Sequence, residues 1–313
     1  MDHPRRLRRR LDAADVLVCP GAHDALTAKV LDQVGFDAVY MTGYGTSLSR
    51  TGHPDAGLIT MTEMLANARA IQQSISVPLI ADADTGFGNA INLIRTVEEY
   101  ITAGIAGIQL EDQQFPKRCG HVEGRQVVGA EEAVGKVAAA ADTRDAADGD
   151  IVIIARTDAR GAVDGSVDAA IERANAFLSV GADVAFVEGL VDLDEARTVA
   201  AAVDGPLLYN ATGISPLADA DTLTEAGFDI LLYPGISTRA TILAMLDVAE
   251  GIRSDGSAAV RELYAAMDDA PIGSLHEFSG FPQVVEWEER YLPEGELQKY
   301  EDTLGEFLAD DGA

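Results

Sequence analysis

Short apolar runs recur along the chain, and each ends in polar residues or glycine. Alanine-rich stretches with helical periodicity lie between them, for example Ala130–Ala141 and Ser166–Val180. Apolar runs of this length, alternating with helices, predict a parallel sheet whose strands are buried on both faces. The eight predicted strands are Val16–Cys19, Ala38–Met41, Pro78–Ala81, Gly107–Leu110, Ile151–Ala155, Val184–Val187, Leu207–Tyr209 and Ile230–Tyr233.

Four similar turns support a repeated architecture. The segments VGFDAVY, AGIAGIQL, VGADVAFVEG and AGFDILLYPG each suggest a helix that ends at glycine before a buried strand. Eight such units predict a (β/α)8 TIM-type barrel, an α/β fold. A doubly wound sheet is the lesser alternative, and no G-x-G-x-x-G loop follows the first strand.

The pattern changes near residue 250 and becomes helical and charged. We expect a catalytic barrel over residues 1–250 and a C-terminal helical extension of the same domain over 251–313. The extension would pack on the barrel or on a neighbouring subunit. Its predicted helices are Ala258–Asp268, Gln283–Tyr291 and Glu294–Leu308.

The composition argues against some classes of binding partner. The 313 residues carry a net charge of −29 and only four lysines, so the surface should repel nucleic acid and anionic membranes. Acidic, lysine-poor surfaces suit high salt, which predicts a halophilic protein, with a merely acidic one as the alternative. No apolar run approaches the ~18 residues that span a bilayer, and no secretory segment follows the basic N-terminus. Two cysteines make no disulfide framework, so a cytoplasmic protein is expected.

Acidic residues follow two neighbouring predicted strands, at the end of a barrel where active sites lie. Asp82 and Asp84 alternate along an extended segment, and Glu111 ends the next strand. Three carboxylates without a second histidine suit Mg²⁺, or Mn²⁺, better than zinc. We expect one direct ligand and two that act through water. A solvated turn is the alternative for an isolated D-x-D.

The segment Lys117–His121 combines two cations, a thiol, a glycine and an imidazole. A thiol beside cations exchanges its proton readily, and the cations can hold carboxylates. This inventory predicts a mobile lid that closes over a small polyacid and offers it a proton. A basic surface loop with an incidental cysteine is the alternative.

Other candidate residues follow the remaining strands. Arg156, at the mouth of a buried strand, needs an anion, which a substrate carboxylate or Glu188 could supply; a purely structural Arg156–Glu188 pair is the alternative. Tyr44 could line the pocket or simply pack. The remaining strand-end candidates are Tyr40, Thr42, Gly43, Asp55, Asn210, Thr212 and Arg239.

The order DADTGFG, GIQLEDQ, PKRCGH and IARTDA resembles the isocitrate lyase / phosphoenolpyruvate mutase superfamily, from about Val16 to Arg239. Within it, KRCGH is typical of the carbon–carbon lyases, and the chain looks closest to the 2-methylisocitrate lyases. The resemblance implies a Mg²⁺-dependent retro-aldol cleavage of a small di- or tricarboxylate. It also implies a homo-oligomer, a dimer of dimers in which dimers exchange a C-terminal helix.

The resemblance also implies residue roles. Asp84 would ligate Mg²⁺ directly, whereas Asp82 and Glu111 would act through water. Cys119 would be the general acid and Tyr40 a candidate base, and Lys117, His121 and Arg156 would stabilise developing charge. The implied substrate contacts are Thr42, Gly43, Tyr44, Asp55, Arg118, Gly120, Arg156, Glu188, Asn210, Thr212 and Arg239.

Several positions depart from the 2-methylisocitrate lyase pattern and leave the substrate open. They are the lid continuation Val122–Arg125, Thr42, Tyr44 and the short loop Asn210–Pro216. The expected reaction is 2-methylisocitrate cleavage to pyruvate and succinate, in the context of propionate catabolism. The alternatives are isocitrate cleavage, dimethylmalate cleavage, oxaloacetate hydrolysis and, least favoured, a non-catalytic barrel.

Overall fold

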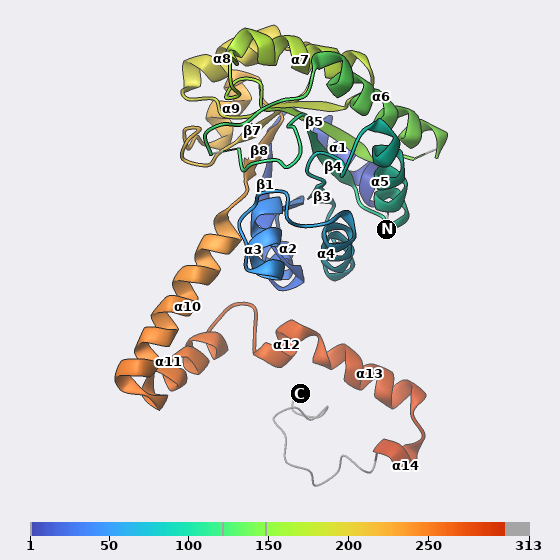
Figure 1. Cartoon of the computed structure of the whole chain (residues 1–313). Coiled ribbons are helices and arrows are strands. Elements are labelled where there is room, and N and C mark those ends of the chain that lie inside the picture. The colour runs from blue at the N-terminus through green and yellow to red at the C-terminus, as the bar shows by residue number, and fades with distance from the viewer. Residues whose placement is uncertain (1, 121, 148, 298–313) are drawn as a thin grey trace. The chain divides into compact units, whose positions relative to one another are not determined.

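Eight parallel strands form a closed barrel in the computed structural model, which describes residues 2–120, 122–147 and 149–297 (Figure 1). The strands pair in sequence order, and β8 closes on β1, so the predicted (β/α)8 fold is confirmed. The strands are β1 (Leu17–Ala22), β2 (Val39–Met41), β3 (Leu79–Asp82), β4 (Gly107–Glu111), β5 (Val152–Thr157), β6 (Val184–Val187), β7 (Leu207–Asn210) and β8 (Ile230–Tyr233).

Helices surround the barrel and continue beyond it. Those up to the last strand are α1 (His3–Leu11), α2 (Ala25–Val34), α3 (Gly43–Thr51), α4 (Met61–Ser74), α5 (Ala90–Thr102), α6 (Ala130–Ala146), α7 (Val167–Ser179), α8 (Leu193–Ala202) and α9 (Ala220–Ala226). After β8 come α10 (Ile236–Asp255), α11 (Ser257–Asp268), α12 (Leu275–Ser279), α13 (Phe281–Tyr291) and α14 (Glu294–Leu297).

The chain divides into two compact units, Met1–Ala240 and Thr241–Ala313. Helix α10 begins in the first unit and continues in the second, across the predicted boundary at residue 250. The extension is helical, as expected, although α14 is described only to Leu297, so the rest of the predicted helix Glu294–Leu308 lies outside the described residues. Helix exchange between subunits stays a prediction.

Local signals explain where the barrel helices begin and end. Asp24 caps α2 in a capping box with Thr27, and Thr60 caps α4 in another box with Glu63. Each box satisfies backbone N–H groups that have no partner within the helix. Helix α2 then ends at Gly35, whose φ of 97° is left-handed and favours glycine.

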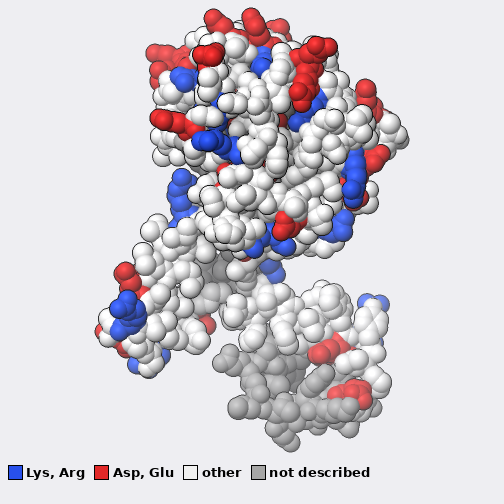
Figure 2. Space-filling model, viewed as in Figure 1, with Lys and Arg blue, Asp and Glu red and all other residues white. Residues whose placement is uncertain are grey.

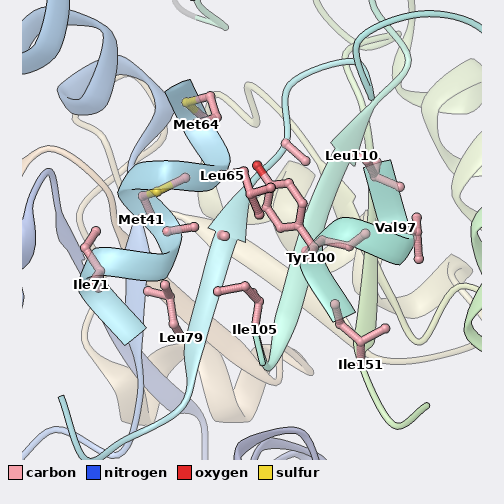
Figure 3. Packing of buried hydrophobic residues seen from close by; sticks show 14 of the residues in the cluster. Met41, Met64, Leu65, Ile71, Leu79, Val97, Tyr100, Ile105, Leu110 and Ile151 are labelled. Carbon is pink, nitrogen blue, oxygen red and sulfur yellow. The ribbon is translucent and has the colours of Figure 1, made fainter. Parts of the chain in front are cut away.

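The apolar core has an inner and an outer layer. One buried cluster fills the barrel interior with side chains such as Ile80, Ile154 and Phe186. The other clusters pack between the strands and the surrounding helices. Figure 3 shows part of the outer layer, where Tyr100 of α5 points its hydroxyl toward the end of β3. That hydroxyl donates to the Asp82 carbonyl at 3.4 Å and so ties a core side chain to the mouth of the barrel.

Helix α1 packs on the amino ends of the strands. Leu7 is fully buried and belongs to the cluster inside the barrel. Two arginines of α1 make ion pairs with residues just outside the strands, Arg8 with Asp183 at 2.8 Å and Arg10 with Asp37 at 3.1 Å. The basic N-terminal segment therefore anchors the helix whose leucine closes the inner core.

The surface of the barrel unit is rich in acid. Figure 2 shows Asp and Glu side chains gathered where Figure 1 places α7 and α8. Among the described residues, no helix is long and apolar enough to cross a membrane. The acidic surface agrees with the sequence-based expectation, and halophily stays a prediction.

We expect Leu7→Ala to lower the free energy of unfolding by about 2–5 kcal/mol, because the substitution leaves a cavity in a closed core. Urea unfolding followed by circular dichroism measures the loss. Arg9→Ala, at an exposed position of the same helix, is the control and should stay within about 0.5 kcal/mol of the unsubstituted chain. Equal losses in the two variants would contradict the role given to Leu7.

Candidate active site

The predicted carboxylates lie at the carboxyl ends of β3 and β4. Asp82 ends β3, and its Oδ1 accepts a 2.9 Å hydrogen bond from the backbone N–H of Asp84. Asp84 has a φ of 47°, an unusual conformation for a residue other than glycine. Glu111 ends β4, and its N–H donates to the Asp84 carbonyl at 2.9 Å. The two strand ends are thus joined directly at the candidate site.

The start of α3 packs against Asp82. A Cβ at Gly43 would collide with the Asp82 carboxylate, so glycine lets the backbone approach it. Thr42 is buried and caps the helix by accepting from the Gly45 N–H. Tyr44 is 45% exposed and therefore lies at the rim of the mouth rather than within the core.

Lys117 lies between two of the carboxylates. Its Nζ is 2.6 Å from an oxygen of Asp55 and 2.7 Å from an oxygen of Asp84. All three side chains are buried. The lid residue therefore reaches into the acid cluster and pairs with it.

Arg156 lies at the centre of a second group of acids. It contacts Asp158 at 2.9 Å, Glu188 at 3.3 Å and Glu111 at 3.5 Å. Asn210 donates to Glu188 at 2.9 Å and extends the network to β7. The anions that this arginine needs are thus present in the protein, and Asp158, to which the sequence analysis gave no role, is the nearest of them.

Burial and mutual repulsion perturb the acids. Burial raises the pKa of Asp82 to about 6, and the charge of Asp84 adds to the rise. Burial also raises the pKa of Asp84 and that of Glu111, against the opposing effects of Lys117 and Arg156. For Lys117, burial alone would lower the pKa, but the surrounding carboxylates outweigh it and hold the pKa well above its usual value. Perturbed groups of opposite sign, gathered at one mouth, are typical of an active site.

The carboxylates at the ends of β3 and β4 have the chemistry expected of Mg²⁺ ligands. In the parts of the chain that the structure describes, no three acid, histidine or cysteine side chains converge closely enough to hold an ion together. Within the described residues, Glu111 Oε1 is among the buried oxygens that have no hydrogen-bond partner, and it belongs to a cluster with an excess of carboxylates. Hard oxygen ligands of this kind suit Mg²⁺, which usually keeps several waters. The set therefore fits a largely hydrated ion with few direct ligands.

The predicted lid is docked on the mouth of the barrel. Gly120 is buried, and a Cβ at that position would collide with the Arg156 guanidinium and the Glu188 side chain. Cys119 is half-buried. Arg118 is exposed, and its guanidinium donates to the Glu123 carbonyl within the loop, away from the acids. His121 lies outside the described residues.

Three other predicted residues are placed away from the acid cluster or tied to another partner. Thr212 accepts from the Ile214 N–H in its own loop, and the Arg239 side chain folds back on Gly235. The Tyr40 hydroxyl is buried and donates to Gln109 at 2.5 Å. Burial and the nearby Asp82 charge raise the pKa of Tyr40, which opposes its use as a base.

The sequence analysis missed residues that support the site from behind. Asp112 accepts hydrogen bonds from Thr157 and from the Asp158 N–H, and it pairs with Arg173 at 3.0 Å. Arg125 of the lid pairs with Asp158 at 2.9 Å. Asp112 and Asp158 stand at strand ends, and that position was the available signal; nothing local in the sequence pointed to Arg125.

A closed (β/α)8 barrel with acids at β3 and β4 and a cationic lid defines an enzyme that acts on a small anion. The family model described as phosphoenolpyruvate phosphomutase matches residues 7–253. The chain belongs to the phosphoenolpyruvate mutase/isocitrate lyase superfamily and is a carbon–carbon lyase of it.

Two relatives illustrate the similarity. The 2,3-dimethylmalate lyase of Eubacterium barkeri is 44% identical over 294 residues, which cover 93% of this chain and 99% of the relative. The 2-methylisocitrate lyase of Halalkalibacterium halodurans is 40% identical over 254 residues, which cover 80% of this chain and 82% of the relative.

Solved structures agree with the fold. A 2,3-dimethylmalate lyase structure has a TM-score of 0.87 at 34% identity and covers 98% of this chain and 99% of its own. An oxaloacetate acetylhydrolase in complex with 3,3-difluorooxalacetate has a TM-score of 0.84 at 34% identity, with coverages of 92% and 97%. A phosphonopyruvate hydrolase complex with oxalate and Mg²⁺ has a TM-score of 0.83 at 33% identity, with coverages of 94% and 100%.

The raised pKa of Asp82 makes a prediction for the metal-free protein. Above pH 6 the ionised carboxylate destabilises the fold, whereas below about pH 4 it is protonated in the folded and unfolded states alike. Asp82→Asn should therefore raise the free energy of unfolding at pH 8 by about 2 kcal/mol, and the gain should shrink as the pH falls through 6.

Urea unfolding in EDTA at pH 8 and pH 5 measures this gain. The asparagine can still accept the hydrogen bond from the Asp84 N–H. Asp142→Asn, at an exposed position of α6, is the matched control and should show no such gain. An Asp82→Asn variant less stable than the unsubstituted chain at pH 8 would refute the idea that charge repulsion dominates here.

Proposed function

We propose that the enzyme cleaves a 2-methyl-branched 2-hydroxy acid in retro-aldol fashion and releases pyruvate. The observation that carries the proposal is the docked lid. Lys117 reaches the carboxylate cluster, and Gly120, directly after the half-buried Cys119, lies against Arg156 and Glu188. The carboxylates at the ends of β3 and β4 suit a cation that would bind the substrate's hydroxy acid. The lid supplies positive charge for a developing negative charge, and a thiol as proton donor.

Two substrates fit this reaction and differ in one group. 2-Methylisocitrate would give pyruvate and succinate, whereas 2,3-dimethylmalate would give pyruvate and propionate. The residue motifs and the 2-methylisocitrate lyase relatives support the first. The relative matched over 99% of its length supports the second. 2-Methylisocitrate has one more carboxylate than 2,3-dimethylmalate and so needs one more positive partner. Lys117 and Arg156 each already contact two or more carboxylates of the protein.

Asp84 would ligate Mg²⁺ directly, with Asp82 and Glu111 acting through water. The choice of Mg²⁺ is supported by the phosphonopyruvate hydrolase structure, a complex with oxalate and Mg²⁺. A bound Mg²⁺ would lower the pKa of the substrate's hydroxyl and favour the α-keto product. The backbone at Thr42 and Gly43 would hold the α-carboxylate, since the first N–H groups of a helix suit an anion.

The remaining steps belong to the lid and to Arg156. A carboxylate of the β3 and β4 ends would take the proton of the substrate's hydroxyl. The carbonyl then forms while the C2–C3 bond breaks, and the electron pair of that bond moves into the carboxylate on C3. Lys117, His121 and Arg156 would stabilise the doubly charged aci-carboxylate group of that fragment. The Cys119 thiol would then protonate C3, and the closed lid would keep water away. We do not propose Tyr40 as the base, because its hydroxyl donates to Gln109 and its pKa is raised.

Oxaloacetate hydrolysis is the second candidate function. It is favoured by the similarity to oxaloacetate acetylhydrolase, which extends over 92% of this chain. The same carboxylates and lid could hold oxaloacetate, and the products would be oxalate and acetate.

A product assay tests these proposals. Purified protein in molar KCl with Mg²⁺ receives 2-methylisocitrate, 2,3-dimethylmalate, isocitrate or oxaloacetate in separate reactions, and the products are quantified. Pyruvate formation, abolished by EDTA and restored by Mg²⁺, is expected from at least one of the first two. Turnover of isocitrate or oxaloacetate alone would replace the proposed reaction, and no turnover of any substrate would overturn it.

Cys119→Ser should lower kcat by about 10²–10⁴-fold, because a hydroxyl is a far weaker acid than a thiol. The melting temperature should change little, since the side chain is only half-buried. Cys19→Ala is the control: it removes the other thiol, from inside the barrel, and should reduce stability while turnover persists. Unchanged turnover in Cys119→Ser would remove the general-acid role.

A further inference from the structure

Lys136 is buried on α6, behind the β3 and β4 ends rather than within the mouth of the barrel. It is 7% exposed, and its Nζ donates to the backbone carbonyl of Thr85. In the described part of the chain, no carboxylate lies within ion-pair distance of this ammonium. Burial lowers the pKa of Lys136, with Glu132, Asp112 and Glu111 opposing that effect. A buried charge whose hydrogen bond goes to a single carbonyl is costly and calls for a reason.

The carbonyl belongs to an unusual loop. Thr85 directly follows Asp84, and the backbone is left-handed at Asp84 and again at Phe87, with φ values of 47° and 61°. Such conformations cost residues other than glycine of order 1 kcal/mol each and persist only when the surroundings fix them. The loop that presents the expected metal ligand is therefore held in place rather than intrinsically stable.

Hydrogen bonds fix the loop on several sides. The Gly86 N–H donates to the Ala83 carbonyl at 2.8 Å, and the Thr96 hydroxyl donates to the Gly86 carbonyl at 3.2 Å. Between these two bonds, the Thr85 carbonyl is directed to Lys136. Without the ammonium, this buried carbonyl would lose a charge-assisted bond, the strong kind.

A small cavity adjoins the lysine. It has a volume of about 10 Å³ and is lined by Lys136 together with Glu111, Asp112 and Arg156, among others. Lys136 therefore borders the acids on the side of this cavity, whereas Lys117 pairs with Asp84 directly. The positive charge of Lys136 also partly offsets the repulsion among these acids.

We propose that Lys136 is a positioning residue for the metal site: by holding the Thr85 carbonyl, it sets the backbone conformation that aims the Asp84 carboxylate. It contacts no substrate and positions Asp84 through the loop Asp82–Gly88. The proposal rests on the proposed function insofar as Asp84 binds a divalent cation.

The test compares Lys136→Met with Val137→Ala. Both positions are on α6 and line the same small cavity, but of the two side chains only that of Lys136 can donate a hydrogen bond to the loop. Mn²⁺ binding without substrate is measured by electron paramagnetic resonance of the free ion. Lys136→Met should raise the Kd by about 10–100-fold, the range for residues that orient metal ligands. Val137→Ala should lose stability while its Kd stays within about twofold of the unsubstituted value.

Hydrogen exchange of the peptide spanning residues 82–88 gives a second readout that needs no metal. Exchange there should rise in Lys136→Met and not in Val137→Ala, and Lys136→Arg, which keeps charge and donors, should recover part of the protection. A Lys136→Met variant with unchanged exchange and unchanged Kd would overturn the proposal. If the unsubstituted chain bound no Mn²⁺, the metal-dependent function would fail, and exchange alone would decide whether Lys136 holds the loop.

Discussion

The constraint on which this structure depends is the burial of several carboxylates at one end of a barrel. Asp55, Asp82, Asp84 and Glu111 are all buried there, and their negative charges repel one another. Lys117 and Arg156 offset this repulsion from inside the protein. The negative charge that remains is what would favour a cation in the proposed metal site.

Lys117 differs from Arg156 because it is carried by a loop. Arg156 belongs to β5 and is paired with Asp158 and Glu188, which are not part of the loop. Lys117 reaches Asp55 and Asp84 only when the lid lies on the barrel. Since a buried carboxylate left without its partner is strongly destabilised, docking of the lid is favoured by the same ion pairs that shape the site. Gly120 completes the arrangement, because any side chain there would strike Arg156.

Much of this could be predicted from the sequence. The barrel could be predicted from the short apolar runs and the repeated glycine turns. Strands of a parallel sheet are buried on both faces, so each appears in the sequence as a nearly continuous apolar run. The acids Asp82, Asp84 and Glu111 could be brought together because parallel strands end at one edge. The main partner of Arg156 was harder to predict. Asp158 lies two residues further along on the same face, but only the side-chain conformations show that Arg156 pairs with it as well as with Glu188. Arg118 and Arg239 turn away from the acids, and loop paths of that kind follow from no local pattern.

Lys136 shows why supporting residues escape sequence analysis. On α6 it stands among alanine and valine residues of the apolar face, where a lysine reads as an ordinary surface residue whose stem covers the core. Its rarity in a chain with four lysines was the only signal. The contact that gives it meaning is a backbone carbonyl on another element, and no side-chain pattern encodes such a partner. Asp84 is thereby constrained twice, by Lys117 at its carboxylate and by Lys136 through its backbone. If Asp84 binds a cation as proposed, a backbone held in this way would reduce the reorganisation that binding requires.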